Sequence, residues 1–179
     1  MAEARGHARA SARGPRVAVV GRGKVGSVLA RELRARGVAV VVWRARSLPS
    51  RLPSVDVVLL CVRDAALEEL ARLVAARLRA PLPEVALHTA GALGPSVLAA
   101  LSERGLAVAQ AHPLLSFAGG ARGPTLSGGA LVIQGDPKAQ RRARWLARQL
   151  GMRPVVGSFD PTVYHAAASI VANGAIALA

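Results

Sequence analysis

Cysteine, aromatic residues and lysine are all scarce in this chain of 179 residues, and each shortage excludes a class of protein. Because Cys61 is the only cysteine, an internal disulfide is impossible and a metal–thiolate cluster is not expected. Cys61 lies in the apolar run 57–62, which favours a buried structural thiol. Aromatic residues make up only 3%, so few rings are present to stack on nucleic-acid bases. No zinc-ligand spacing occurs, and we predict no metal site.

Long apolar runs are missing as well. No stretch approaches the roughly 20 residues of a membrane span, so no membrane association is expected. Residues 1–15 are rich in Ala, Arg and Gly and lack the apolar core of a signal peptide. We therefore expect a disordered basic arm over 1–15 and a cytoplasmic protein.

Negative charge is in short supply, because 10 acidic residues stand against 24 basic ones and the net charge is +14. Lys24 and Lys138 are the only lysines, and the arginines are spread along the whole chain. Such a skew is more typical of a GC-rich coding bias than of a surface that tracks phosphates. A basic surface still attracts polyanions weakly and in a salt-sensitive way. No specific nucleic-acid partner is expected, and an Arg-rich nucleic-acid binder stays open only as the least favoured functional hypothesis.

Val, Leu, Ala and Ile dominate the 52% of hydrophobic residues, as in parallel sheets covered on both faces. Strand-like and helix-like segments alternate along the chain, which is typical of a doubly wound α/β fold. We predict a Rossmann domain over 16–158 with a mostly parallel sheet of about seven strands. The expected strands are 16–21, 38–43, 56–62, 85–88, 106–110, 130–134 and 153–156. The expected helices cover about 24–36, 95–104 and 137–150. A further helix is expected after Asp64, with five residues facing inward: Leu67, Leu70, Leu73, Val74 and Leu78.

The final segment, 159–179, reads as a helix with almost no polar surface after His165 and no C-terminal cap. A helix that is apolar all round must be buried against other protein. The segment is expected to be the first helix of a truncated C-terminal helical domain, or to be covered by a partner subunit. A homodimer through this region is predicted.

A phosphate cradle is predicted at residues 21–26, where GRGKVG matches G-x-G-x-x-G between a strand and a helix. The first glycine allows a tight turn, the second lets the backbone approach a pyrophosphate, and the third lets the helix pack on the sheet. Amides at the helix start then hold the phosphates. The expected cofactor residues here are Gly21, Arg22, Gly23, Lys24, Val25 and Gly26.

The end of the second strand indicates which dinucleotide binds. NAD sites carry an acid there for the ribose hydroxyls, but no acid occurs from 38 to 55. Arg44 and Arg46, with Arg22, are placed to pair with a 2′-phosphate instead. We predict NADP as the preferred cofactor, with Val62 and Arg63 after the third strand also at the cofactor.

Candidate catalytic residues lie where ligands of open α/β sheets bind, beyond the carboxyl ends of the strands. Thr89 and His88 lie at the end of the fourth strand, and His112 follows the fifth. Asp64 follows the third strand, where a helix cap is a simpler role for it than a catalytic acid. A single histidine is more often a structural, backbone-bonded residue than a catalytic one. Tyr164, His165, Ser169 and Asn173 are the polar residues of the last segment, and the last three share one helix face.

With these residues in place, the chain resembles the 6-phosphogluconate-dehydrogenase-like group of NADP-binding oxidoreductases. More closely, it resembles uncharacterised Rossmann-like proteins that continue into a C-terminal helical domain of unknown function. The matching stretches are 17–37, 56–64, 88–93, 112–117 and 164–168 with Asn173. That group carries Ser where this chain has Ala90, which leaves Thr89 for any hydroxyl role. His112-Pro113 and the 165–173 segment also resemble prephenate dehydrogenases, and the layout resembles pyrroline-carboxylate and ketopantoate reductases.

These resemblances imply hydride transfer between NADP and a small carbonyl, imine or hydroxy acid. His112 and His165 would act as acid/base or orienting groups, and Asn173 would position the substrate. In related enzymes the C-terminal helical domain completes the cleft and forms the dimer. The alternative is a non-catalytic NADP-binding sensor or scaffold, because fold alone does not decide function.

Overall fold

A seven-stranded sheet forms the centre of the protein in a computed structural model, which describes residues 14–117, 123–160 and 163–164. The strand order is β2-β1-β3-β4-β5-β6-β7. The strands are β1 Val17–Val20, β2 Val40–Trp43, β3 Val57–Leu60, β4 Val85–His88, β5 Ala107–Leu114, β6 Ala130–Gly135 and β7 Arg153–Val156. Four α-helices are described: α1 Lys24–Ala35, α2 Leu67–Arg77, α3 Ala99–Ser102 and α4 Pro137–Gln149. Three short 3₁₀ turns complete the described elements: η1 Ala45–Ser47, η2 Asp64–Ala66 and η3 Pro95–Leu98.

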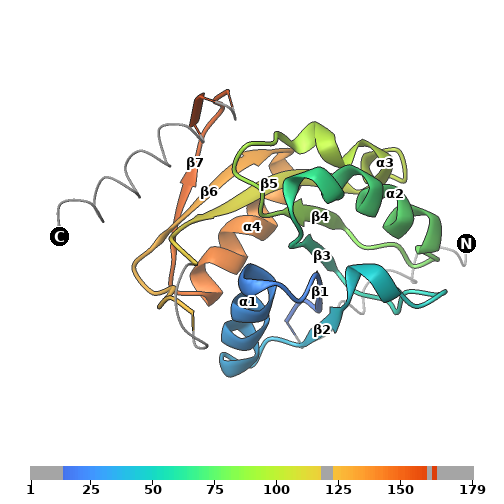
Figure 1. Ribbon diagram of the computed structural model, residues 1–179, viewed down its shortest axis with the longest axis horizontal. Coiled ribbons are helices and arrows are strands. Elements are labelled where there is room, and N and C mark those ends of the chain that lie inside the picture. The colour runs from blue at the N-terminus through green and yellow to red at the C-terminus, as the bar shows by residue number, and fades with distance from the viewer. Residues whose placement is uncertain (1–13, 118–122, 161–162, 165–179) are drawn as a thin grey trace, which may run out of the picture.

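Helices cover both faces of this sheet (Figure 1), so the doubly wound Rossmann prediction is confirmed. Successive side chains of a strand point to opposite faces. Val17 and Val19 of β1 therefore pack in a core with α1 and α4, while Ala18 and Val20 pack in a second core with α2 and α3. Because both faces are covered, β1, β3 and β4 are buried along their whole length.

The first five strands are parallel, and β6 pairs antiparallel with β5. This pairing extends β5 to Leu114, four residues past the strand end expected from the sequence. β5 pairs with β4 only as far as Gln110, and its remaining residues pair with β6. His112 and Pro113 were expected to follow the fifth strand but lie within β5, because their strand conformation depends on pairing with β6.

Two details of α2 differ from the sequence expectation. Leu73 was expected on the inner face but is 39% exposed, whereas Leu67, Leu70 and Val74 are buried. At 3.6 residues per turn, Leu73 falls beyond Leu70 at the rim of the buried face. Asp64 was expected to cap this helix, but its side chain makes no cap hydrogen bond; it opens η2, and its carbonyl accepts from the Leu67 amide.

No described helix combines the length and apolar character that a membrane crossing requires. Within 14–117, 123–160 and 163–164, no group of three His, Cys, Asp or Glu side chains is placed to share a metal ion.

Candidate functional site

Two glycines let the loop after β1 pack tightly against its neighbours. Gly21 has φ of +120°, a conformation that L side chains rarely adopt. A Cβ on Gly21 would overlap the backbone carbonyl of Cys61, and a Cβ on Gly26 would overlap the carbonyl of Gly21. The close packing expected of Gly26 is therefore observed, and α1 starts directly against the ends of β1 and β3.

Gly23 has a different environment from the other two glycines. A Cβ built on it would meet no protein atom within 4 Å, and its φ of −70° is open to any residue. Gly23 is the N-cap of α1, and the first helical hydrogen bond runs from the Ser27 amide to the Gly23 carbonyl. The preceding amides of the first turn thus have no intrahelical acceptor and favour an anion. The space that Gly23 leaves open is suited to a phosphate group.

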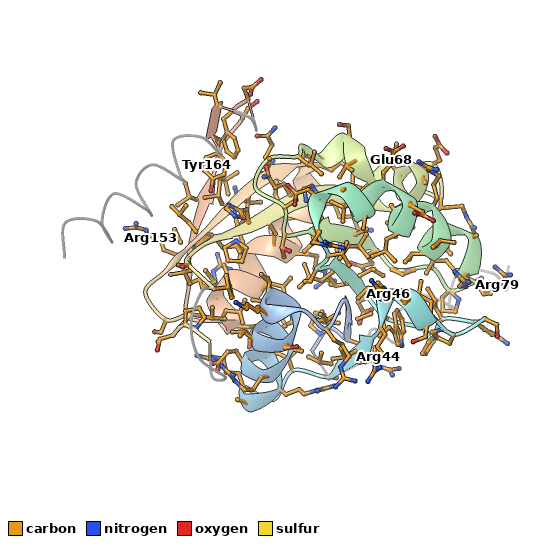
Figure 2. The ribbon with its side chains drawn as sticks, in the orientation of Figure 1. Arg44, Arg46, Glu68, Arg79, Arg153 and Tyr164 are labelled. Atoms are coloured by element: carbon orange, nitrogen blue, oxygen red, sulfur yellow. The ribbon has the colours of Figure 1, made fainter. Side chains whose placement is uncertain are left out.

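A pocket of about 610 Å³ lies over this loop at the carboxyl ends of β1 to β4. Five of its side chains are cationic, and none of its described lining residues is Asp or Glu. Arg44 and Arg46 stand at the end of β2 in Figure 2, and both are exposed. The sequence-predicted residues that line it are Gly21, Arg22, Gly23, Lys24, Val25, Arg44, Arg46, Val62, Arg63 and Thr89. Gly26 lies behind the loop and supports it.

Thr89 forms the wall of this pocket on the β4 side. It is 9% exposed, and its amide donates to the Leu60 carbonyl at 3.2 Å. Cys61 lines the same pocket, and burial raises the pKa of its thiol to about 12, opposed by a hydrogen bond with Thr89. The thiol is therefore neutral at physiological pH, consistent with the structural role expected for Cys61.

A second polar group lies further along the same edge of the sheet, on β5. His112 Nδ1 is 2.9 Å from the Tyr164 hydroxyl, and the two rings meet edge to face. Burial raises the pKa of Tyr164 to about 12, so the phenol stays protonated. Phe159 packs on Tyr164 at a centroid distance of 4.8 Å, and the Asp160 carboxylate accepts from the Val163 amide. These contacts place Tyr164 beside His112.

The structure thus separates the predicted catalytic residues. Thr89 joins the cofactor pocket, whereas His112 lies outside its lining and pairs with Tyr164. His165 and Asn173 lie outside the described residues. Tyr164 was not expected to be a catalytic residue; its signal in the sequence is its place among the few polar residues of an otherwise apolar last segment.

His88, at the end of β4, is fully buried. Burial lowers the pKa of its imidazole to about 4, and nearby His112 acts in the same direction. The Gly94 backbone lies close enough to oppose this shift, but no described group makes a hydrogen bond of ordinary geometry with the ring. His88 is therefore neutral at physiological pH and unavailable to solvent.

No protein-family model matches this sequence, and no curated protein matches it significantly. Solved structures do match, among them a protein from Thermotoga maritima with 20% identity and a TM-score of 0.65. That match covers 90% of this chain and 65% of the other, so this chain spans about two thirds of its neighbour's length.

Two further neighbours are dehydrogenases. Mycobacterium tuberculosis 3-hydroxyisobutyrate dehydrogenase, solved with L-serine, has 18% identity and a TM-score of 0.68, covering 91% of this chain and 60% of that one. Prephenate dehydrogenase from Aquifex aeolicus, solved with hydroxyphenyl propionate and NAD+, has 16% identity and a TM-score of 0.58, covering 94% and 72%. At these identities the likeness establishes the fold alone, a Rossmann-like fold that this chain shares with the two dehydrogenases.

Proposed function

We propose that the protein is an NADP-dependent oxidoreductase that transfers hydride between nicotinamide and a small carbonyl, imine or hydroxy acid. The pocket at the carboxyl ends of β1 to β4 carries this proposal, because it joins an open glycine cradle to five cations and has no acidic residue in its described lining. The dehydrogenase neighbours with the same fold support it. The homodimer expected through residues 159–179 stays a prediction.

The cofactor would lie along the strand ends in the order that the sheet dictates. Its pyrophosphate would rest on the first amides of α1, beside Gly23. Its adenosine ribose would lie at the end of β2, where Arg44 and Arg46 would hold a 2′-phosphate. Because β3 and β4 lie on the other side of β1, the nicotinamide would lie toward Arg63 and Thr89.

Bound nicotinamide supplies or accepts the hydride, and the chain itself must move the accompanying proton. His112 and Tyr164 are the proposed groups for this proton transfer. In the tautomer of His112 whose Nδ1 accepts from the Tyr164 hydroxyl, the ring proton is on Nε2. His112 would give a proton to a substrate oxygen or nitrogen during reduction and take it back in the reverse direction.

Equilibrium binding of NADPH and NADH tests the cofactor assignment. We expect NADPH to bind at least about tenfold more tightly, since charged hydrogen bonds contribute about 1.5–3 kcal/mol each. The double variant Arg44→Ala/Arg46→Ala should lose this preference and keep its NADH affinity. Arg153→Ala, an exposed arginine on β7 at the far side of the sheet in Figure 2, is the matched control. Equal affinities in the wild type would refute NADP preference, and failure of both ligands to bind would refute the nucleotide site.

Turnover separates an enzyme from a non-catalytic module with the same pocket. NADPH consumption is measured with a panel of small 2-oxo acids and cyclic imines, and NADP reduction with hydroxy acids. For any substrate found, His112→Ala and Tyr164→Phe should lower kcat with little change in NADPH affinity. A chain that binds NADPH tightly but turns over none of the panel would favour the sensor or scaffold.

A further inference from the structure

Two fully buried polar side chains lie on the same face of the sheet, at paired positions of the neighbouring strands β4 and β5. His88 and Gln110 are register partners in the parallel pairing, and each is 0% exposed. Burying an amide is costly unless its groups form hydrogen bonds. A glutamine buried on the same face of β5 as the apolar Val108 therefore calls for a specific role.

The Gln110 amide holds the backbone that leaves β4. Its Nε2 donates to the Ala90 carbonyl at 2.8 Å and to the Gly91 carbonyl at 3.0 Å. Both amide hydrogens are used, and the two carbonyls fix the orientation of the group, because a reversed amide would set oxygen against two oxygens. The Gln110 side chain thus ties β5 to the two residues that follow Thr89.

This tether fixes the wall of the nucleotide pocket. Thr89 is held on one side by its amide bond to Leu60 of β3, and the segment after it is held by Gln110. Gln110 and His112 are two residues apart in β5, so their side chains share one face of the sheet. Gln110 therefore lies between the pocket wall at Thr89 and the His112–Tyr164 pair.

We propose that Gln110 is a positioning residue, whose carboxamide holds segment 89–91 so that Thr89 meets the nicotinamide half of the cofactor. This inference rests on the proposed function, because it takes the pocket to be a dinucleotide site. It assigns Gln110 no contact with substrate or cofactor. The amide acts through the backbone carbonyls of Ala90 and Gly91.

Binding of two ligands by the full chain tests this role. NADPH occupies both halves of the pocket, whereas adenosine 2′,5′-bisphosphate lacks the nicotinamide half. Gln110→Met keeps the length of the side chain and removes both donors. It should weaken NADPH binding about five- to tenfold, about 1 kcal/mol or slightly more, and leave the bisphosphate affinity unchanged. The fluorescence of bound NADPH should also shift, because it reports on the nicotinamide surroundings.

Gln140 offers a matched control, since its Nε2 also donates to a backbone carbonyl, that of Gly135 at 2.7 Å, outside the pocket. Gln140→Met should bind both ligands as the wild type does. If Gln110→Met fails to fold, Gln110→Glu retains the shape and, when protonated, one donor, and should show a smaller loss of the same kind. Equal weakening of both ligands, or no change in either, would overturn the positioning role. A wild type that binds neither ligand would instead refute the proposed function.

Discussion

At the scale of single residues, Gly23 is a cradle position where a substitution should weaken ligand binding with little effect on stability. Its Cβ direction is open and its φ is ordinary, so Gly23→Ala should change stability by no more than about 1 kcal/mol. The added methyl would stand where the pyrophosphate approaches, and NADPH affinity should fall at least about tenfold. Gly26→Ala is the contrasting variant, because its Cβ overlaps backbone and should cost about 3 kcal/mol. Thermal unfolding and NADPH titration measure both effects; unchanged NADPH affinity in Gly23→Ala would remove the cradle assignment.

His88 is expected to make stability depend on pH. Its pKa is lowered from 6.5 to about 4 in the folded protein, so the unfolded chain binds the proton more readily. Stability should therefore fall as the pH drops from 6.5 toward 4, and His88 should have no effect above this window. A shift of this size corresponds to about 3 kcal/mol. Urea unfolding across the window should show a shallower decline in His88→Gln than in the wild type; parallel declines would contradict the buried, neutral histidine.

The residues of the site differ in how far the sequence could predict them. Gly21 and Gly23 follow from a short pattern between a strand and a helix, and Arg44 and Arg46 from the absence of an acid after the second strand. The structure places these four residues around one pocket. Tyr164 meets His112 across 52 positions of sequence, and Gln110 meets Ala90 across 20. No local pattern encodes such contacts. Gln110 also has the sequence appearance of an ordinary polar residue, and its role depends on complete burial.

At the scale of elements, α2 offers a direct test of which leucines form the core. Leu70 is 2% exposed, whereas Leu73 is 39% exposed on the rim of the same helix. Leu70→Ala should lower the free energy of unfolding by about 2–4 kcal/mol, and Leu73→Ala by less than about 1 kcal/mol. Chemical denaturation of the two variants measures the difference. Similar losses at both positions would mean that the face of α2 toward the sheet is assigned wrongly.

The elements themselves were largely predictable from the sequence. Strands β4 and β7 have the expected bounds, and helices α1 and α4 end within one residue of their expected ends. Strand β5 was predicted four residues too short, because its last residues are stabilised by antiparallel pairing with β6. The antiparallel direction of β6 is a property of the tertiary fold, which hydrophobic periodicity does not report.

At the scale of the whole molecule, the positive charge has two components that a ligand would experience differently. The net charge of +14 acts on any polyanion that approaches the protein. The five cations around the pocket act on one bound ligand at short range. Salt screens the first component strongly, because exposed charges interact little beyond the Debye length of about 8 Å at physiological ionic strength. Short, hydrogen-bonded pairs to a phosphate are screened less.

Salt titration therefore separates a nucleotide site from a diffuse basic surface. Binding of a short DNA duplex should weaken by orders of magnitude between about 50 and 200 mM salt, as expected for phosphate contacts without base recognition. NADPH should remain bound over the same range, with a steeper salt dependence than NADH because its 2′-phosphate adds charge near Arg44 and Arg46. The Arg44→Ala/Arg46→Ala variant should make the two salt slopes equal, while Arg153→Ala should not. Duplex that stays tightly bound at physiological salt and is not displaced by NADPH would instead identify the basic surface as a nucleic-acid site.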